Sequence, residues 1–332
     1  MLFSHHTADS PAIKRSKGSK FGRLVFIIII LSSIAYGVNI LYRQKDRILF
    51  KFKEDSYKEL ENKLSAIEKN KIRYDTPEVK EFLDLLKALL KDTNEDGYLH
   101  YMQGRLYFSI FSDPIEGNEF LFRNFIFSGY LEKGNFMPQL KKNFWQESIL
   151  SYRKAILLSI PQEMIETAEK NLGYLYFWGG KSFSRSGYKY AEKNRFDKVY
   201  DLYNILLVEN VPNWENLKNY FSEDNIRLFE SVYYLKTGNT PLAFTRINKL
   251  SISEDIELRN MANYLAGSFM GKQNKKKTQF AYYSKINLET FLLNNKWFLA
   301  EYNFLLRFLG YDRLAAEVLN KYEKMTLEKT IF

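Results

Sequence analysis

Few residues of this 332-residue chain have the type and spacing that catalysis or ligand binding requires. Gly179-Gly180-Lys181-Ser182 matches the end of a phosphate-binding loop, whose backbone amides wrap the phosphates of a nucleotide. The first glycine of such a loop would fall at position 175, which is Leu175, and the preceding residues have a helical pattern instead of a strand pattern. The sequence therefore predicts no nucleotide site here, and no other cofactor site.

A second segment has the first ligands of an EF-hand calcium loop, with Asp92, Asn94 and Asp96 supplying oxygen atoms. Position twelve of that loop must supply a bidentate carboxylate, and here it is Gln103. The chain also has no second loop to pair with the first. We interpret the segment as a polar turn between two helices, and a calcium-dependent adaptor remains an alternative function.

Catalytic side chains are equally sparse. The absence of cysteine excludes a thiolate nucleophile, a disulfide framework and a Cys-ligated zinc ion. His100 is the single histidine outside the N-terminal tail, so a histidine-based acid or base would have to be this residue. The 39 acidic residues leave an enzyme with an unrecognised carboxylate pair as another alternative, but no pair stands out. The prediction is a protein that is not an enzyme.

The net charge of +10 is concentrated at the N-terminus. Residues 1–53 contain ten Lys or Arg and two acidic residues, whereas residues 54–332 have a net charge of only +2. Nucleic-acid binding depends on a basic surface that neutralises phosphates. The folded region lacks such a stripe, so we expect no nucleic-acid partner.

The basic residues flank an uncharged run of nineteen residues, 24–42. As a helix it would be roughly 28 Å long, close to the ~30 Å hydrocarbon thickness of a bilayer. We predict a disordered basic tail over 1–23 and a single transmembrane helix over 24–42. A signal peptide cleaved after Ser33-Ile34-Ala35 is the alternative. The flanking Lys and Arg counts are nearly balanced and do not set the orientation. The short tail and the lack of cysteine favour an inner-membrane anchor with a periplasmic C-terminal domain.

After the anchor the chain has a helical pattern throughout. Residues 43–74 predict a juxtamembrane stalk helix whose apolar seam could self-associate, formed by Tyr57, Leu60, Leu64 and Ile67. Thr76 and Pro77 then form a helix start. Further breakers separate later helices: Pro161, Pro212 and Pro241 open segments, and Gly238 and Gly310 close them. We therefore predict an all-α fold.

One repeat pattern runs through the second half of the chain. Small and large apolar positions from Gly187 to Leu206 recur from Ser231, Gly267 and Asn303. The last three copies begin 36 residues apart, and the first begins 44 residues earlier. This pattern resembles the tetratricopeptide repeat family. The resemblance implies an α-solenoid of stacked helix pairs over 75–328, with an insertion at 111–143 and a concave binding surface.

The resemblance also implies which side chains face partners. First-helix positions on the concave side correspond here to Tyr188, Val232, Lys236, Tyr264, Phe304 and Arg307. Half of them could belong to the core if the register is shifted by one turn.

Two segments interrupt the repeat. The insertion contains EFLFRNFIFSGYLEKGNF, whose aromatic residues could form a docking patch or could pack an extra helix against the repeats, which is the interpretation we favour. The cluster of Lys272, Lys275, Lys276 and Lys277 is interpreted as a solvated inter-helix loop, with an anion site as the alternative.

The layout of basic tail, anchor, stalk and cysteine-free repeats is similar to that of the anchored periplasmic tetratricopeptide proteins of spirochaetes, some of which build the collar of the periplasmic flagellar motor. The similarity implies a membrane-anchored scaffold that mediates protein–protein interactions in a larger envelope assembly. Its expected partners are other proteins of a multi-subunit, membrane-associated assembly, and self-association is a further expectation.

Overall fold

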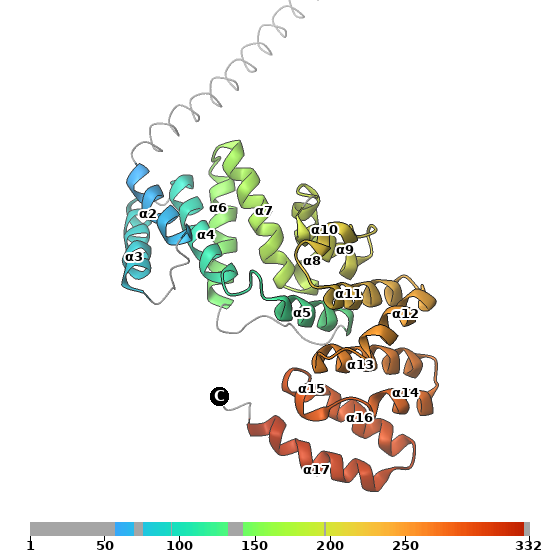
Figure 1. Ribbon diagram of the computed structural model, residues 1–332. Coiled ribbons are helices and arrows are strands. Elements are labelled where there is room, and N and C mark those ends of the chain that lie inside the picture. The colour runs from blue at the N-terminus through green and yellow to red at the C-terminus, as the bar shows by residue number, and fades with distance from the viewer. Residues whose placement is uncertain (1–56, 70–75, 94, 132–141, 196, 329–332) are drawn as a thin grey trace, which may run out of the picture. The chain divides into compact units, whose positions relative to one another are not determined.

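The computed structural model describes residues 57–69, 76–93, 95–131, 142–195 and 197–328 (Figure 1). These residues form sixteen α-helices and no strand, which confirms the all-α prediction. The chain divides into two compact units, Met1–Glu61 and Asn62–Phe332, and all helices from α3 onward belong to the second. The helices are α2 (Lys58–Lys69), α3 (Pro77–Asp92), α4 (Gly97–Ser112), α5 (Glu119–Leu131), α6 (Lys142–Leu157), α7 (Gln162–Trp178), α8 (Lys181–Glu192), α9 (Lys198–Leu207), α10 (Trp214–Lys218), α11 (Glu223–Lys236), α12 (Thr240–Leu250), α13 (Ile256–Lys272), α14 (Lys276–Tyr283), α15 (Leu288–Asn294), α16 (Trp297–Phe308) and α17 (Asp312–Glu328).

The predicted tail over 1–23, the predicted span over 24–42 and most of the predicted stalk lie outside the described residues. None of the helices that the structure describes is long and apolar enough to cross a membrane.

The second compact unit begins at Asn62, so it includes residues 62–69 of the predicted stalk. Leu64 and Ile67 of α2 are buried. The guanidinium group of Arg105 on α4 binds the Glu68 carboxylate through two contacts, Nη2 to Oε2 at 2.5 Å and Nε to Oε1 at 3.0 Å. Burying an aliphatic side chain stabilises a fold by about 1.5–3 kcal/mol, so docking this seam is favoured over leaving it in water.

Helices begin and end where local signals predicted. Thr76 is the N-cap of α3 with Pro77 in its first turn, and Pro161 is the N-cap of α7. Gly238 and Gly310 have φ angles of 78° and 80°, in the left-handed region that lets the chain leave a helix and reverse. Glycine populates this region without the steric penalty that a Cβ atom would bring.

The four predicted repeat copies coincide with successive helices: α8 and α9, α11 and α12, α13 and α14, and α16 and α17. The first copy differs in one respect, because α8 packs more extensively on α7 than on α9. Its longer spacing also has a structural reason. The short helix α10 follows α9, and Asp201 holds it by accepting hydrogen bonds from the Asn213 backbone N–H and the Asn216 Nδ2, both at 2.8 Å.

Glycine at the small position of a copy lets two helices approach closely. A Cβ atom at Gly267 on α13 would lie 2.5 Å from the ring of Tyr283 on α14, sixteen residues later. Gly187 and Tyr203 have the same sixteen-residue spacing and an even closer contact between α8 and α9. The predicted small and aromatic positions are therefore in direct contact in these two copies.

The insertion divides one further helix pair. A Cβ atom at Gly104 on α4 would lie 2.8 Å from the ring of Tyr152 on α6, so this pair makes the same kind of contact as α13 and α14. Helix α5 lies between them in sequence but packs elsewhere, against α9 and α11. The chain therefore leaves the α4 and α6 pair, forms α5, and returns.

Candidate interaction surface

An exposed aromatic surface lies on α16 and the turn that follows it. Phe304 is 68% exposed and Phe308 is 59% exposed, and their ring centroids are 6.5 Å apart because residues four apart share one face of a helix. Tyr311, which is 47% exposed, continues this surface beyond the end of α16. We call Phe304, Phe308 and Tyr311 the C-terminal aromatic patch.

Helix α14 contacts the patch through two of its side chains. The Lys276 ammonium group lies 6.0 Å from the centroid of the Phe308 ring, and the Phe280 ring lies 5.2 Å from that of Tyr311. Lys276 and Phe280 are four residues apart and so occupy one face of α14. Helix α14 therefore contacts both the Phe308 ring on α16 and the Tyr311 ring in the turn.

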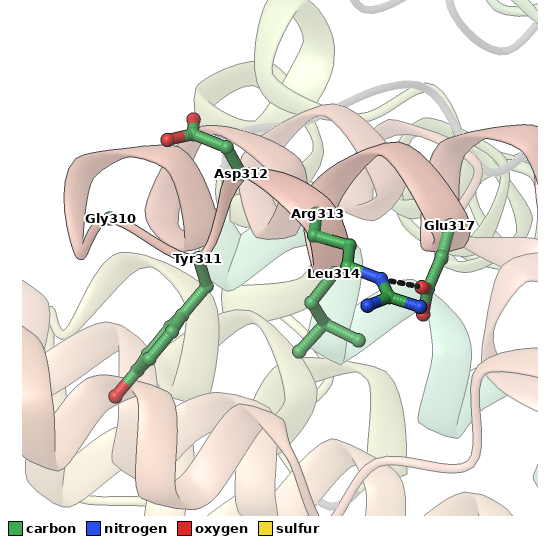
Figure 2. A pocket seen from close by; sticks show the side chains of 6 residues that line it. All are labelled: Gly310, Tyr311, Asp312, Arg313, Leu314 and Glu317. Atoms are coloured by element: carbon green, nitrogen blue, oxygen red, sulfur yellow. Dashed lines mark hydrogen bonds and ion pairs between the residues drawn. The ribbon is translucent and has the colours of Figure 1, made fainter.

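A pocket that is open to solvent adjoins the patch (Figure 2). The Tyr311 and Leu314 side chains extend to the same side of the chain, whereas Asp312 points to the opposite side. Arg313 Nε donates a hydrogen bond to Glu317 Oε1 at 3.0 Å. The pocket thus offers an apolar wall beside the patch, with an ion pair at its far edge. Its lining residues are Gly310, Tyr311, Asp312, Arg313, Leu314 and Glu317.

Basic residues occur on α14, which supports the patch, and on α16, which carries its two phenylalanines. Residues 268–288 contain five lysines and no acidic residue, and the side chains of all but Lys276 are exposed. On α16, Arg307 is exposed and its Nε donates to Asn303 Oδ1 at 3.1 Å. Lys272 ends α13, while Lys275, Lys276 and Lys277 begin α14, so the cluster occupies two helix ends as well as the loop between them.

Two of the six predicted binding residues, Phe304 and Arg307, lie on this surface. Tyr188 on α8 is half-buried, and its hydroxyl oxygen accepts a hydrogen bond from Asn210 Nδ2 at 2.7 Å. Burial together with the neighbouring Tyr200 hydroxyl raises the pKa of Tyr188 to about 12. Lys236 is exposed at the end of α11 and donates to the backbone carbonyl of Leu206 on α9. These two residues belong to helices other than those that form the patch.

The remaining two predicted residues, Val232 and Tyr264, are core residues. Val232 is 0% exposed and Tyr264 is 1% exposed, so neither side chain presents a surface to a partner, and the expectation for them is corrected. The Tyr264 ring stacks on Tyr283 at a centroid distance of 5.4 Å and an interplanar angle of 9°. Their hydroxyls both contact the Glu301 carboxylate, at 3.1 Å from Tyr264 and 2.6 Å from Tyr283. Burial and this carboxylate raise the pKa of Tyr264 above its usual value.

Phe122, Phe125 and Phe127 of the insertion are buried, which favours the extra-helix interpretation over a docking patch. The Phe122 ring lies 4.9 Å from Trp178 on α7, and the Phe127 ring lies 5.6 Å from Tyr264 on α13. Phe125 is also buried, with its ring 4.5 Å from that of Phe177. Residues 132–141 of the insertion lie outside the described residues.

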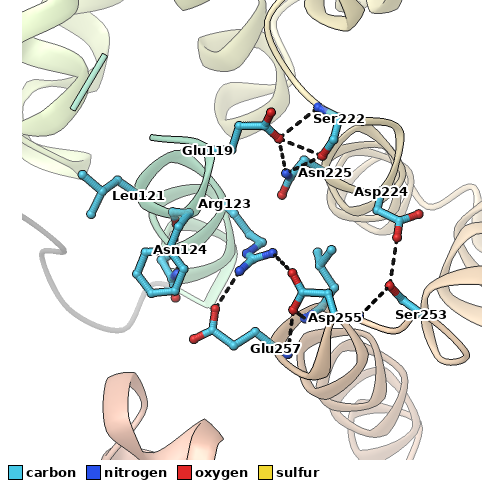
Figure 3. A network of polar contacts seen from close by, with 12 residues as sticks. Glu119, Leu121, Arg123, Asn124, Ser222, Asp224, Asn225, Ser253, Asp255 and Glu257 are labelled. Atoms are coloured by element: carbon cyan, nitrogen blue, oxygen red, sulfur yellow. Dashed lines mark hydrogen bonds and ion pairs between the residues drawn. The ribbon is translucent and has the colours of Figure 1, made fainter. Parts of the chain in front are cut away.

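Polar contacts fix α5 between two helix N-termini (Figure 3). Arg123, whose side chain is 8% exposed, binds two carboxylates of the α13 N-terminus: Nη1 lies 2.6 Å from Asp255 Oδ2 and Nη2 lies 2.7 Å from Glu257 Oε2. Glu119 Oε2 accepts hydrogen bonds from the Ser222 backbone N–H at 2.9 Å, from Ser222 Oγ at 2.7 Å and from Asn225 Nδ2. One helix of the insertion therefore holds α11 and α13 at the same time.

These contacts displace the pKa values of two carboxyl groups. Burial alone would raise the pKa of Glu119, but the hydrogen bonds from Ser222 and Asn225 and the charge of Arg123 lower it below its usual value. Burial would likewise raise the pKa of Asp255, but the contact with Arg123 and the backbone N–H groups of Leu258 and Glu257 lower it below its usual value.

The calcium-loop and nucleotide-loop segments have structural roles where they are described. Asp96 is the N-cap of α4, and its Oδ1 accepts from the backbone N–H of Tyr98 at 3.0 Å and of Leu99 at 3.3 Å. Asn94 and the side chain of Asp92 lie outside the described residues. No group of three or more His, Cys, Asp or Glu residues that could hold a metal ion occurs in the part of the chain that was placed. Gly180 of the nucleotide-loop segment is the N-cap of α8. The segment therefore forms a turn between the helices α7 and α8.

The sequence analysis missed Phe308, Tyr311 and Leu314. A signal for them was present, because Phe304 and Phe308 are spaced by one helical turn and the left-handed Gly310 turn immediately follows them.

No protein-family model matches this chain, and no curated protein or solved structure is significantly similar to it.

Proposed function

We propose that this protein is a membrane-anchored helical-repeat scaffold that binds other proteins through the C-terminal aromatic patch, and that it is not an enzyme. The exposure of Phe304 and Phe308 is the observation that carries the proposal. Burying a phenylalanine side chain is worth about 1.5–3 kcal/mol. Single exposed apolar residues are ordinary, but three exposed aromatic rings on α16 and the turn after it, beside a pocket, are typical of an interaction surface.

The helix order supports a scaffold built from repeats. Helix α13 packs on α12 and α14, α14 packs on α16, and α16 packs on α17. Contacts of this kind between neighbours in sequence are typical of solenoids of stacked helix pairs, which present extended surfaces to partners. The predicted helix over 24–42 anchors this solenoid in the inner membrane, with the repeats on the periplasmic side.

The similarity to anchored tetratricopeptide proteins of spirochaetes gives the scaffold a cellular setting. In that setting it is a component of the collar around the periplasmic flagellar motor, and its partners are other collar and motor proteins. Cells that lack the protein should assemble an incomplete collar and swim poorly. An intact collar in such cells would exclude this setting without excluding a scaffold in another envelope assembly.

Site-specific photo-crosslinking tests the binding surface. A photoreactive phenylalanine analogue is placed at position 304 or 308 of the full-length protein in its own membranes, and at Leu157 as a matched control. Leu157 is 80% exposed on α6 and lies outside the patch. The proposal expects defined, stoichiometric adducts at 304 and 308 that are absent at 157. Equal labelling at all three positions, or no adduct at 304 and 308, would contradict it.

A further inference from the structure

We infer that the partner segment that docks on the C-terminal aromatic patch is an acidic, amphipathic helix of another protein. This inference rests on the proposed function and specifies the chemistry of the partner. It depends on three properties of the surface: its charge, the lack of acidic residues at the N-terminus of α14, and the spacing of its aromatic rings.

The charge around the patch is positive on balance, although the pocket beside Tyr311 also contains Asp312 and Glu317, of which Glu317 pairs with Arg313. Five lysines and no acidic residue occupy residues 268–288, although residues 54–332 as a whole have a net charge of only +2. Arg307 adds a further positive charge on α16 between the two exposed phenylalanines. A partner that lies on Phe304 and Phe308 therefore meets a positive potential, which favours carboxylates at its edges.

The N-terminus of α14 lacks the negative charge that helix N-termini usually carry. Lys275 is its N-cap and makes no capping hydrogen bond, and the first turn contains Lys276 and Lys277 but no acidic residue. The positive end of a helix dipole is stabilised by anions and destabilised by cations. The neighbouring helix α13, by contrast, begins with Asp255 as a side-chain cap and Glu257 in its first turn. Carboxylates of a docked partner would supply at the N-terminus of α14 the negative charge that Asp255 and Glu257 supply at the N-terminus of α13.

The spacing of the rings favours a helical partner. Phe304 and Phe308 lie one turn apart along α16, and Tyr311 extends the row beside the pocket that Leu314 lines. An amphipathic helix presents apolar side chains at positions i, i+4 and i+7, which match a row of this kind. Its apolar face would cover the rings, and one apolar side chain would enter the pocket, while carboxylates on its flanks approach Lys276, Lys277 and Arg307.

Selection from a displayed random-peptide library tests the inference. The bait is the full-length protein in lipid nanodiscs, and the variant F304A/F308A serves to subtract peptides that bind elsewhere. We expect the remaining peptides to combine acidic residues with apolar residues at helical spacing, and to bind more weakly as salt is raised, because ions screen exposed charges. Enrichment of neutral or basic peptides, or of none that depends on the two phenylalanines, would overturn the inference.

Charge reversal provides the second arm. The variant K276E/K277E/R307E should weaken binding of a selected acidic peptide on the order of tenfold or more and should itself select basic peptides. The matched control K80E/K87E/K91E reverses three exposed lysines of α3, outside the patch, and should leave the affinity unchanged. Equal losses in both variants would show a non-specific effect of net charge and would also overturn the inference.

A membrane surface is the competing occupant. Vesicles of phosphatidylglycerol that bind wild-type protein but not F304A/F308A, together with a failed peptide selection, would assign the patch to lipid and overturn the inference. A crosslinked partner at position 308 whose docked segment lacks acidic residues would overturn the inference but leave the proposed function standing. Loss of the crosslinks themselves would instead overturn the proposed function.

Discussion

The contact between Gly187 on α8 and Tyr203 on α9 leaves no room for a methyl group, so Gly187→Ala should destabilise the protein strongly. The new Cβ atom would lie 1.8 Å from the Tyr203 hydroxyl oxygen and 2.7 Å from Cβ of Tyr176 on α7. The Tyr176 Cβ atom is fixed to its backbone and cannot rotate away. Tyr203 is 1% exposed and its ring is in contact with Phe177 at 5.3 Å, so it has little space to move.

The size of the effect follows from three contributions. Forcing extra volume into a packed core costs about 1–3 kcal/mol. Displacing Tyr203 also breaks the hydrogen bond that its hydroxyl donates to the Gly173 carbonyl oxygen, at 3.0 Å, and a buried donor without an acceptor costs about 1–3 kcal/mol. Alanine regains about 1 kcal/mol over glycine inside a helix. We therefore expect Gly187→Ala to lower the free energy of unfolding by about 3 kcal/mol.

Urea unfolding of the full-length protein in detergent, followed by circular dichroism, measures this loss. The same substitution at Gly129 is the control, because a Cβ atom there meets chiefly the end of the Leu206 side chain, which can rotate. The double variant G187A/Y203F removes the closest oxygen and should be more stable than the sum of the two single losses predicts. A Gly187→Ala protein that unfolds at the wild-type urea concentration or above would refute the close approach of α8 and α9.

Three further predictions concern α5 and the patch. Arg123→Met should lower the free energy of unfolding by about 2–4 kcal/mol, because it leaves the carboxylates of Asp255 and Glu257 without their cation. Water screens part of this loss, since Asp255 is partly exposed. Double-mutant cycles with Asp255→Asn measure the coupling energy. Glu119→Gln should destabilise the protein at neutral pH. The difference from wild type should shrink as the pH falls below the ordinary carboxyl pKa of 4.5 and vanish below the lowered pKa of Glu119 in the folded protein, because the stability that a lowered pKa gives is lost on protonation. A difference that is constant with pH would contradict this. Phe304→Ala with Phe308→Ala should change the urea midpoint by less than that of Gly187→Ala while it abolishes patch crosslinks, since both rings are largely exposed.

Local signals in the sequence predicted the ends of helices well, because the physics that sets them is local. A proline after Thr76 suits the first turn of a helix, and a glycine at position 238 or 310 can adopt a positive φ angle that other residues disfavour. The sixteen-residue spacing from Gly267 to Tyr283 was also visible in the sequence, because it spans the last turns of one helix, the connecting turn and the next helix.

The faces of the helices were harder to predict. Val232 and Tyr264 have the apolar character of a binding surface, but their helices are contacted on more than one side, so an apolar position can face another helix instead of a partner. Helix α11 packs on α5, α9, α12 and α13. A helical period identifies a stripe of apolar residues, yet it does not say what covers that stripe. The exposure of Phe304 and the burial of Tyr264 could therefore be assigned only in three dimensions.

The contacts of α5 were beyond sequence reasoning because their partners are distant in the chain. Arg123 lies 132 residues from Asp255, and Glu119 lies 103 residues from Ser222. The sequence EFLFRNF nevertheless contained a clue, since a lone arginine among aromatic residues must either reach solvent or find a carboxylate. The same limit applies to Glu68, which pairs with Arg105 and draws the end of the predicted stalk into the second compact unit.

Helix α5 has a consequence for how the described helices unfold. In a linear array of repeats each unit contacts only its neighbours, so stability is a sum of local contributions and the ends can open separately. Here Phe122 contacts α7, Glu119 caps α11, and Arg123 and Phe127 reach α13, so α5 joins three helices that are far apart in the sequence. Opening any of these helices exposes part of the α5 aromatic core as well. We therefore expect amide exchange in α7, α11 and α13 to share one opening free energy in the wild type and to separate into distinct values in Arg123→Met, whereas independent exchange in the wild type would contradict a joining role for α5.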